Sequence, residues 1–325
     1  MNKLTIGIDI GATKIAGALV SREGKILKRI ECPTNAVEGG QAVMARVADL
    51  ALELASAARA PLEGAGVAAA GQIDPKTGVV LAATPLIPDW TGTRIKDVLE
   101  ERLGIPARVI NDGNAAGLGE GAFGAARNVR DFVLLTIGTG VGGGIVSDGR
   151  LIEGASRVAG AIGHMVIDCD GRPCNCGSRG CLEAYTSGTS MASRALELAD
   201  MRGLDTPLIR SIRADLSQGA KLLGEAAVAG DAFALEVIHE AGEYLGWGLV
   251  SLINLFNPEM IVVGGSVAEM GDLLLAPARE VAMSNALKGA RRMVRIVKAQ
   301  LGNNAGILGA ASLIWKTTDG TEEVE

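Results

Sequence analysis

A group of metal-ligating side chains lies between residues 160 and 183. This stretch, GAIGHMVIDCDGRPCNCGSRGCLE, contains one of the two histidines and four of the five cysteines of the chain. Four residues follow the spacing H-x9-C-x-C-x4-C: His164, Cys174, Cys176 and Cys181. Three thiolates and one imidazole suit tetrahedral Zn²⁺, and four protein ligands leave no open position for a substrate. The pattern therefore predicts a structural zinc ion.

The residues around these four ligands support this interpretation. Gly171, Gly177 and Gly180 allow a short loop to turn back so that the four side chains face one centre. The alternatives are separate free thiols or disulfides. Buried cysteines rarely cluster with a histidine at such short spacing, and nothing in the chain suggests an oxidising compartment. We expect the ion to shape the loop for the residues beside it, His164 and Glu183.

Two glycine turns are candidates for phosphate binding. The residues of the first that can do chemistry are Asp9, Gly11, Thr13 and Lys14. Backbone N–H groups and a threonine hydroxyl can face a terminal phosphate there, while Asp9 can hold a Mg²⁺-bound water. The second turn stands at the equivalent place in a second half of the chain: Gly138, Thr139 and Gly140. One such turn is equally well an ordinary hairpin, but two of them can grip one polyphosphate from both sides, which favours nucleotide binding.

A third glycine pair, Gly264-Gly265, follows an apolar strand. The missing side chains would let an adenine or a ribose lie against the backbone, and a simple turn explains the pair equally well.

Asn111 and Asp112 follow another buried strand. A carboxylate at this place can accept a proton from a sugar hydroxyl. Phosphoryl transfer passes through a loose transition state, so such an aspartate mainly orients the nucleophile and takes its proton late. The alternative is that the pair only caps the helix that follows.

The hydrophobic pattern places these residues at strand ends in an α/β arrangement. Strands are predicted at 4–10, 15–20, 26–31, 64–70, 107–110, 131–137, 145–146, 260–263 and 293–296. Helices are predicted at 40–58, 95–103, from about 111 onward, and at 185–202, 222–228, 232–256 and 306–315. Residues 317–325 read as a disordered polar tail. The order of strand, glycine turn, strand and polar turn occurs near both residue 4 and residue 131, which indicates an internal duplication.

Composition limits the class of protein. The chain has 325 residues, enough for two domains, and a net charge of -6, which argues against a nucleic-acid surface. Neither a signal peptide nor an apolar run of about 18 residues is present, so we expect no membrane association and a cytoplasmic protein with reduced thiols.

Taken together, the two phosphate turns, the Asn-Asp pair and the Gly-His plus CxCGxxGC loop ending in Leu-Glu resemble the ROK family of sugar kinases. The resemblance runs from Ile8 to about Ala311. It implies two actin-like (ribonuclease-H-like) domains with an active site in the cleft between them. We expect a smaller domain over 1–115 plus about 300–325, and a larger one with the zinc loop over 116–299.

The resemblance also assigns roles to single residues. It implies that Asp112 is the catalytic base, that Asn111, His164 and Glu183 hydrogen-bond the sugar, and that Gly71 approaches the sugar through its backbone. ATP with Mg²⁺ is the expected phosphoryl donor, and polyphosphate is the alternative. Some members are repressors with an added N-terminal DNA-binding segment, a branch that we do not expect here. The long helix at 232–256 is compatible with a homodimer or homotetramer.

The sequence departs from the family pattern at one sugar-binding position. Members usually have Ala-Gly-Glu-x-Gly-His before the zinc loop, whereas Ala161 stands here in place of the glutamate. A lost charge-assisted hydrogen bond is worth about 1.5–3 kcal/mol, or roughly tenfold to hundredfold in affinity. Arg157 also occupies a position where the family tends to have glycine, either as a new donor or as a solvated loop residue.

These observations predict an ATP-dependent hexose kinase that phosphorylates the 6-hydroxyl, with glucose as the leading substrate. An N-acetylmannosamine or N-acetylglucosamine kinase is the second interpretation, because the space at Ala161 suits a bulkier substituent. A catalytically weak sugar-binding or sensing protein is the third.

Overall fold

The computed structural model describes residues 3–83 and 86–318. Its described residues form two compact units. The first comprises Met1–Val129, Gly144–Gly160 and Gln300–Glu325, and the second comprises Arg130–Gly143 and Ala161–Ala299. Residues 116–129 and 144–160 thus belong to the first unit, whereas the sequence analysis assigned them to the larger domain. The domain boundaries expected from the sequence stay a prediction.

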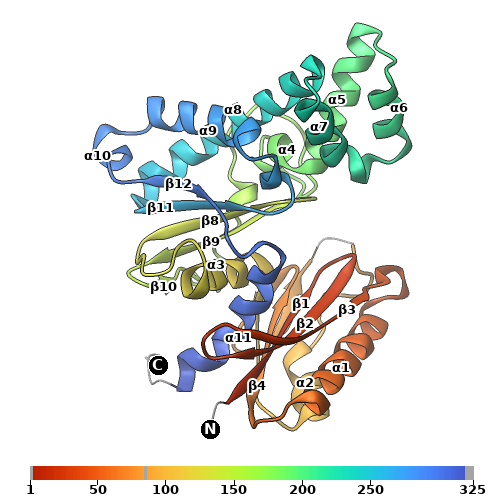
Figure 1. Cartoon of the computed structure of the whole chain (residues 1–325), viewed down its shortest axis with the longest axis vertical. Coiled ribbons are helices and arrows are strands. Elements are labelled where there is room, and N and C mark those ends of the chain that lie inside the picture. Colours follow the sequence, from red (N-terminus) through yellow and green to blue (C-terminus); the bar gives the residue numbers. More distant parts are fainter. Residues whose placement is uncertain (1–2, 84–85, 319–325) are drawn as a thin grey trace. The chain divides into compact units, whose positions relative to one another are not determined.

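A five-stranded sheet forms the centre of the first unit (Figure 1), with the order β3-β2-β1-β4-β7. Its strands are β1 (Leu4–Ile10), β2 (Lys14–Ser21), β3 (Ile26–Pro33), β4 (Leu62–Ala69) and β7 (Ala107–Asn111). β1 is antiparallel to β2 and parallel to β4, and β4 is parallel to β7. The register aligns Ile10 with Ala69, and Ala69 with Asn111. The carboxyl ends of three parallel strands therefore share one edge, where ligands bind in open α/β sheets.

Helices cover both faces of this sheet. On one face, α1 (Gly40–Ala57) and α2 (Ile95–Leu103) pack on the isoleucines of β1 in the main apolar core. On the other face lie α3 (Asp112–Phe123) and α11 (Ala305–Thr318). Glycine permits close approach of α11: a Cβ on Gly66 would lie 1.8 Å from the carbonyl oxygen of Ala310. Strands covered on both faces read as continuous apolar runs, which explains the sequence pattern.

Short elements complete the first unit. They are the 3₁₀ turns η1 (Ala36–Glu38) and η5 (Gly302–Asn304) and the ribbon of β5 (Gln72–Asp74) and β6 (Val79–Ala82).

The second five-stranded sheet has the order β10-β9-β8-β11-β12. Its strands are β8 (Phe132–Ile137), β9 (Val141–Ser147), β10 (Arg150–Leu151), β11 (Met260–Gly264) and β12 (Arg295–Lys298). β9 is antiparallel to β10, and β11 is parallel to both β8 and β12. Both sheets thus begin with consecutive strands and continue with two parallel ones, which matches the internal duplication inferred from the sequence.

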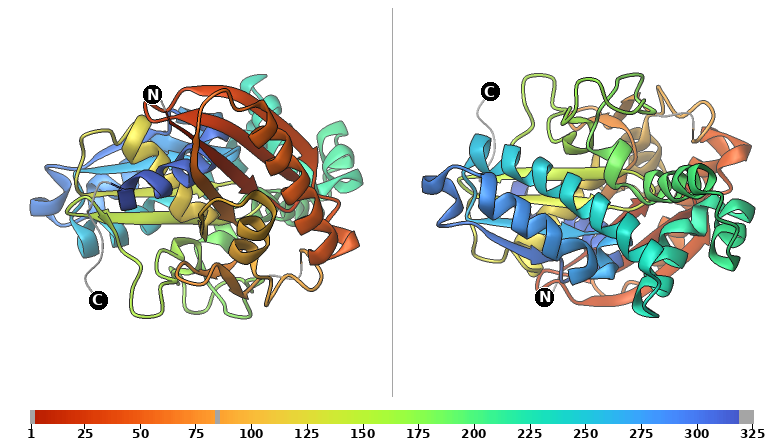
Figure 2. Two further views of the ribbon diagram at one scale, coloured as in Figure 1. Left: turned by 90° about the horizontal axis from the view of Figure 1, so that it is seen from below. Right: turned by 90° about the horizontal axis from the view of Figure 1, so that it is seen from above.

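Most helices of the second unit belong to the segment between β10 and β12. They are α4 (Glu183–Thr186), α5 (Gly188–Arg202), α6 (Pro207–Ala214), α7 (Gly219–Val228), α8 (Ala232–Phe256), α9 (Asp272–Asn285) and α10 (Lys288–Arg291). The 3₁₀ turns are η2 (Ile162–His164), η3 (Leu216–Gln218) and η4 (Val267–Met270). α8 and α9 run side by side (Figure 2) because Gly242 and Gly246 admit Pro277 and Val281.

Most predicted elements are confirmed, with shifts of one to four residues at their ends. The helix predicted at 185–202 is two helices, because Ser187 adopts an extended conformation and caps α5. Helices α6, α9 and the four-residue α10 were not predicted. The tail prediction at 317–325 is wrong for Thr317 and Thr318, which continue α11, and its remainder lies outside the described residues. Among the described helices, none is long and apolar enough to cross a membrane.

Candidate active site

Asn111 and Asp112 stand at the junction of β7 and α3 in the first unit. Asn111 caps α3: its side-chain oxygen accepts hydrogen bonds from the N–H groups of Gly113 (3.0 Å) and Asn114 (3.2 Å). Its amide nitrogen donates to the carbonyl oxygen of Gly71 (2.9 Å) and to Oδ1 of Asp112 (3.0 Å). The helix-capping alternative is therefore correct for Asn111. The same bonds fix the Asp112 carboxylate and bring Gly71 to this strand edge.

The Asp112 carboxylate lies in a low-dielectric environment. Burial raises its pKa, and hydrogen bonds from the Gly113 N–H (2.8 Å) and from Asn111 oppose this rise. Oδ1 accepts both of these hydrogen bonds, which leaves Oδ2 as the oxygen available to a ligand. A carboxylate with a raised pKa is suited to accept a proton, because its basicity approaches that of the group it serves.

Asp9, near the end of β1, is the second carboxylate of this edge. Burial and the charge of Asp112 raise its pKa to about 7, while Lys14 and Arg29 act in the opposite direction. A Cβ on Gly306 would lie 2.7 Å from an Asp9 carboxylate oxygen, so the first turn of α11 closes over this group. Two like charges in one buried place favour a bound cation, and carboxylate oxygens suit Mg²⁺.

The first glycine turn is anchored to the start of the next loop. The Gly11 N–H donates to the Lys14 carbonyl oxygen (3.0 Å), and the Thr34 hydroxyl donates to the Gly11 carbonyl oxygen (2.7 Å). The Thr34 N–H donates to the Thr13 carbonyl oxygen (3.0 Å). The Lys14 ammonium pairs with Glu31 (3.1 Å), so the turn carries a positioned cation at its exposed side.

The four predicted metal ligands gather in the second unit. The ligand atoms of His164, Cys174, Cys176 and Cys181 all lie within 4.8 Å of one another. Nδ1 of His164 is 3.7 Å from Sγ of Cys174, and the sulfurs of Cys176 and Cys181 are also 3.7 Å apart. Two sulfurs on one tetrahedral zinc ion lie about 3.8 Å apart. The cluster is therefore compatible with a structural zinc ion, and the Nε2 atom of His164 remains for another partner.

The electrostatics of the cluster also favour a cation. Burial and the neighbouring thiols raise the pKa of Cys181 to about 12. Burial also raises the pKa of Cys174, whereas hydrogen bonding lowers that of Cys176. Three thiolates cannot coexist at this distance without a positive charge among them, and a bound metal supplies that charge.

The zinc loop is attached to the helices by a polar network that the sequence analysis missed. The Tyr185 hydroxyl donates to Asp168 (2.9 Å) and accepts from the Arg172 N–H (3.0 Å). The Arg172 guanidinium lies 4.8 Å from the centre of the Tyr185 ring and pairs with Glu240 of α8 (3.1 Å). These contacts fix the loop before Cys174. Spacing gives no signal for them, because Glu240 is far away in the sequence.

The second glycine turn lies on the start of α4 and α5. The Gly188 N–H donates to the Gly138 carbonyl oxygen (2.7 Å), and the Thr189 hydroxyl donates to the Thr139 carbonyl oxygen (2.9 Å). Oε2 of Glu183 accepts from the Val141 N–H (2.8 Å). The predicted residues Gly138, Thr139, Gly140 and Glu183 are thus neighbours.

The Gly264-Gly265 pair has a steric explanation. Gly265 has a φ of +88°, and a Cβ there would lie 2.3 Å from the Ile137 carbonyl oxygen. Close packing of β11 on β8 therefore requires glycine, and nucleotide contact at this pair stays a prediction.

The two positions that differ from the family pattern, Arg157 and Ala161, lie close together in the sequence before η2. Ala161 is exposed and immediately precedes η2. Arg157 has a φ of +61°, a left-handed conformation in which glycine has no steric cost. The backbone at 157 therefore favours the family's glycine. The pKa of Asp74 is lowered mainly by a hydrogen bond from the Thr77 side chain, and the charge of Arg157 adds to this lowering.

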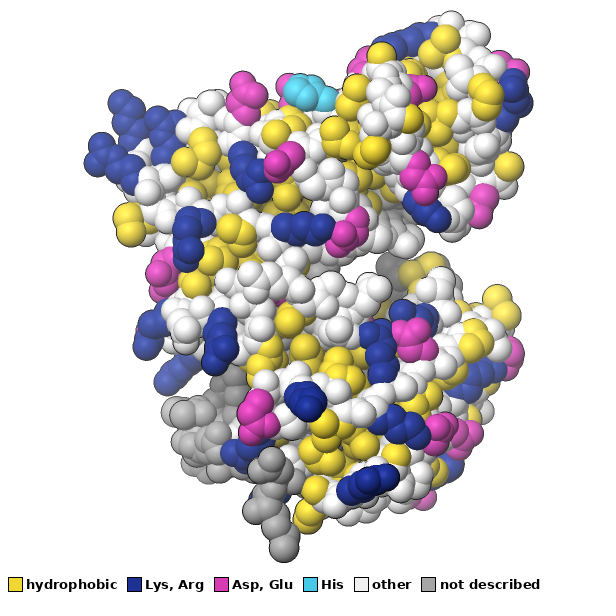
Figure 3. Space-filling view, in the orientation of Figure 1, with side chains coloured by type: hydrophobic (Ala, Val, Ile, Leu, Met, Phe, Trp, Pro, Cys, Tyr) yellow, Lys and Arg dark blue, Asp and Glu magenta, His cyan; other side chains and the backbone are white. Residues whose placement is uncertain are grey.

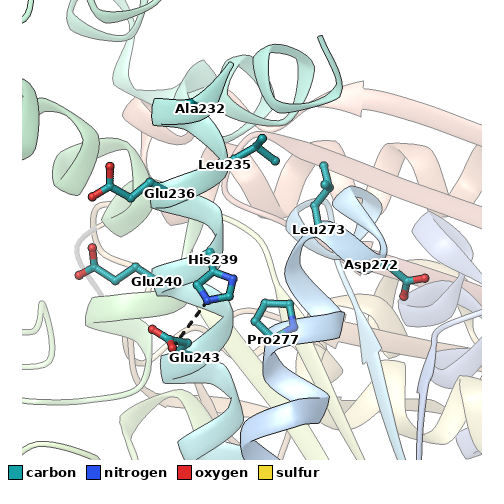
Figure 4. A pocket seen from close by; sticks show the side chains of 9 residues that line it. All are labelled: Ala232, Leu235, Glu236, His239, Glu240, Glu243, Asp272, Leu273 and Pro277. Carbon is teal, nitrogen blue, oxygen red and sulfur yellow. Dashed lines mark ion pairs between the residues drawn. The ribbon is translucent and has the colours of Figure 1, made fainter. Parts of the chain in front are cut away.

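A groove of about 700 Å³ between α8 and α9 contains none of the predicted site residues (Figure 4). Its polar side chains are Glu236, His239, Glu240, Glu243 and Asp272. This acidic lining would repel the phosphates of a nucleotide, so we do not place the active site there. On the face of this unit seen in Figure 3, acidic and basic side chains alternate and a basic group gathers over α10, so this face lacks the long basic stripe of a nucleic-acid surface.

The predicted residues therefore form one group within each unit, and comparisons with known proteins bear on what they do. A sequence profile of the ROK family matches residues 5–317. The glucokinase of Halalkalibacterium halodurans is 37% identical over 323 residues, which cover 98% of this chain and 97% of that protein. The glucokinase of Thermotoga maritima is 36% identical over 310 residues, which cover 95% of this chain and 96% of that protein.

Solved structures agree. A ROK family glucokinase from Streptomyces griseus, in complex with glucose and AMPPNP, superimposes with a TM-score of 0.80 at 36% identity, covering 95% of this chain and 98% of that one. The predicted α/β fold of two actin-like domains is confirmed by this similarity. This chain belongs to the ROK family.

Proposed function

We propose that the chain is an ATP-dependent hexose kinase that phosphorylates the 6-hydroxyl of a sugar, with D-glucose as its substrate. The observation that carries the proposal is the Asp112 carboxylate, held by Asn111 and the α3 N-terminus with a raised pKa and one oxygen left for a ligand. The glucokinases similar to this chain, and the structure of one with glucose and AMPPNP, support the choice of sugar and nucleotide.

Asp112 acts as the general base. The 6-hydroxyl oxygen of the sugar attacks the terminal phosphorus of ATP, and Oδ2 of Asp112 accepts the proton of that hydroxyl. The bond between the terminal phosphorus and the bridging oxygen breaks, and ADP leaves. The transition state is loose, so the proton moves late and the main work of Asp112 is to orient the hydroxyl. Asn111 holds the carboxylate in place through its bond to Oδ1.

The nucleotide binds at the glycine turns. The residues that supply backbone N–H groups and side-chain donors to the phosphates are Gly11, Thr13, Lys14, Gly138, Thr139 and Gly140. Gly264 and Gly265 lie against the nucleoside. Asp9 would hold Mg²⁺ through water, and such an ion would supply positive charge to the phosphates.

The sugar-orienting groups come from the zinc loop and its neighbours. His164 uses Nε2 and Glu183 uses Oε1 to bind sugar hydroxyls, and the backbone at Gly71 also contacts the sugar. Zinc acts structurally, because His164, Cys174, Cys176 and Cys181 fill its four positions.

The setting of the enzyme follows from the same features. Free thiols at a metal site require a reducing compartment, so we place the protein in the cytoplasm. It acts without nucleic acid or membrane. We propose a homodimer or homotetramer, since Trp247, Leu255 and Phe256 of α8 leave apolar surface exposed, and light scattering checks the mass.

The test is a coupled ADP-release assay with a panel of glucose, mannose, N-acetylmannosamine and N-acetylglucosamine. We expect glucose to give the highest kcat/KM, and Asp112→Asn to lower kcat by about 10²–10⁴ while glucose still binds by calorimetry. Asp97→Asn, a change of an exposed carboxylate in the same unit, is the control and keeps activity. A turnover of glucose by Asp112→Asn equal to that of the wild type would contradict the assignment of the base.

The exposed Ala161 favours a second candidate, a kinase for an N-acetylated hexosamine. Ala161→Glu distinguishes the two, because a carboxylate there adds a hydrogen bond to sugar hydroxyls and fills the space of a bulkier substituent. A roughly tenfold to hundredfold gain in glucose kcat/KM supports the glucose kinase, whereas a loss together with high activity on an N-acetylhexosamine supports the alternative. Tight sugar binding with no ADP release for any sugar would identify a sensing protein.

A further inference from the structure

Glu183 is placed between two functional groups of the second unit. Its Oε2 accepts a hydrogen bond from the Val141 N–H (2.8 Å), at the end of the second glycine turn. Its Oε1 lies 3.8 Å from the sulfur of Cys174, one of the metal ligands. One carboxylate therefore contacts both the phosphate-binding turn and the zinc loop.

The turn is tightly packed on this carboxylate. A Cβ on Gly140 would lie 2.6 Å from Oε2 of Glu183, so a small displacement of the side chain is felt directly by the backbone of the turn. Among the described residues, the Thr139 and Gly140 N–H groups donate to no other group. Because Glu183 accepts a hydrogen bond from the Val141 N–H, it fixes the orientation of the turn and therefore of the Thr139 and Gly140 N–H groups.

The other end of the link is the contact between Oε1 of Glu183 and the sulfur of Cys174 (3.8 Å). The backbone of Glu183 is fixed, because its carbonyl oxygen accepts from the Ser187 N–H (3.1 Å) and the Ser190 hydroxyl (2.8 Å). The loop before Cys174 is held by Arg172, Tyr185 and Glu240 without a metal. The backbone of the next segment has bonds of its own, from the Cys174 N–H to the Ser178 carbonyl oxygen (2.9 Å) and from the Gly180 N–H to the Arg172 carbonyl oxygen (2.8 Å). A bound metal would additionally fix the side chain of Cys174, which the Glu183 carboxylate contacts.

We propose that Glu183 is a positioning residue that transmits the order of the zinc loop to the phosphate-binding turn, so that metal occupancy sets nucleotide affinity even when no sugar is bound. This inference rests on the proposed function, because it assumes that Gly138–Gly140 bind nucleotide phosphates. It adds a second task to the sugar contact of Glu183.

The test measures Mg²⁺–AMPPNP binding to the full chain by calorimetry without sugar. Zinc-loaded, zinc-stripped and zinc-restored protein are compared. We expect removal of zinc to weaken AMPPNP binding about tenfold, which is the expected effect of losing one well-oriented hydrogen bond to the phosphates. Re-addition of zinc should restore the affinity. In Glu183→Ala the two forms bind AMPPNP with equal affinity, whereas Glu183→Gln, which retains an acceptor for the Val141 N–H, keeps part of the difference. Glu225→Ala on α7 is the matched control, since Glu225 is exposed and pairs only with Lys221 among described residues, and it keeps the full difference.

Linkage supplies a second readout that a purely structural role would not move. If zinc raises nucleotide affinity by a given factor, AMPPNP raises zinc affinity by the same factor. Competition with a metal chelator measures this in wild type and in Glu183→Gln. Hydrogen exchange at the Val141 amide gives a third measurement should Glu183→Ala fold poorly, because stripping zinc from the wild type is expected to speed exchange there.

The outcomes separate the two proposals. Stripped and loaded wild type that bind AMPPNP equally would overturn the inference while leaving the kinase assignment intact. A zinc effect of equal size in Glu183→Ala and wild type would also overturn it. Absence of any AMPPNP binding and of ADP release in loaded wild type would instead refute the proposed function.

Discussion

Replacing Asp9 by asparagine tests the electrostatics of the first unit directly. Burial and the Asp112 charge raise the pKa of Asp9 from 3.8 to about 7. A raised carboxyl pKa means that folding favours the protonated form. The stability of the folded chain is therefore full below about pH 4, and it falls as the pH rises from there to about 7.

The magnitude follows from the two pKa values. At 1.36 kcal/mol for each pKa unit, the raised pKa of Asp9 lowers the free energy of unfolding by about 1 kcal/mol at pH 4.5 and by about 4 kcal/mol at pH 8. These are upper values, because the carboxylate retains some contact with water. No hydrogen bond to the Asp9 carboxylate is seen among the described residues, so Asp9→Asn loses none. The variant should therefore be more stable than wild type, and more so at high pH.

Urea unfolding at pH 4.5 and pH 8, without nucleotide or Mg²⁺, measures this effect. We expect the gain in unfolding free energy from Asp9→Asn to be about 3 kcal/mol larger at pH 8 than at pH 4.5. Asp49→Asn on α1 is the control: Asp49 is exposed and pairs with Arg102, and its replacement should change stability by less than about 0.5 kcal/mol at either pH. A gain from Asp9→Asn that is the same at both pH values would refute the reasoning.

Further predictions concern the zinc loop and the loop before it. Gly180→Ala should lower zinc content and cost about 2 kcal/mol or more, because its Cβ would lie 1.5 Å from the Asp168 carbonyl oxygen; metal analysis and urea unfolding check this. Gly177→Ala is its control, since open space surrounds that position, and only backbone strain of about 1 kcal/mol is expected. Arg157→Gly should be about 1 kcal/mol more stable than Arg157→Ala, because only glycine relieves the left-handed backbone, and equal stability of the two would contradict this. Removing zinc by dialysis against a chelator should lower the melting temperature of wild type, and re-addition of zinc should restore it.

The fold was predictable because its signals are local. An apolar strand followed by a glycine turn occurs once in each half, with the turns at Gly11 and Gly138. The cysteines of the metal cluster are close in sequence as well as in space. The unpredicted helices are α6 and α10, which are short, and α9, whose interior contains Pro277. A proline normally argues against a helix, and the packing of its ring against Gly242 of α8 is a contact that the sequence does not reveal.

The contacts that organise the site were less accessible to sequence reasoning. Glu183 was assigned to the sugar from family resemblance alone, and its bond to the Val141 N–H joins residues 42 apart in the chain. The Arg172–Glu240 pair joins residues still farther apart. Side-chain pairs of this kind depend on the packing of helices on a sheet. Periodicity records which face of an element is buried but not which polar group it meets.

The two buried carboxylates explain why this edge of the first sheet is suited to a charged ligand. Burial raises the pKa of both Asp9 and Asp112, and the charge of Asp112 raises the pKa of Asp9 further. A fold selected only for stability would replace at least one of them. A cation bound beside Asp9 removes that cost, because it favours the ionised form of both groups. Ionised Asp112 is also the form that can accept a proton. Under the proposed function, this arrangement would link binding of Mg²⁺ and nucleotide to activation of Asp112 as the base, and Asp9→Asn should separate the two by gaining stability while losing turnover.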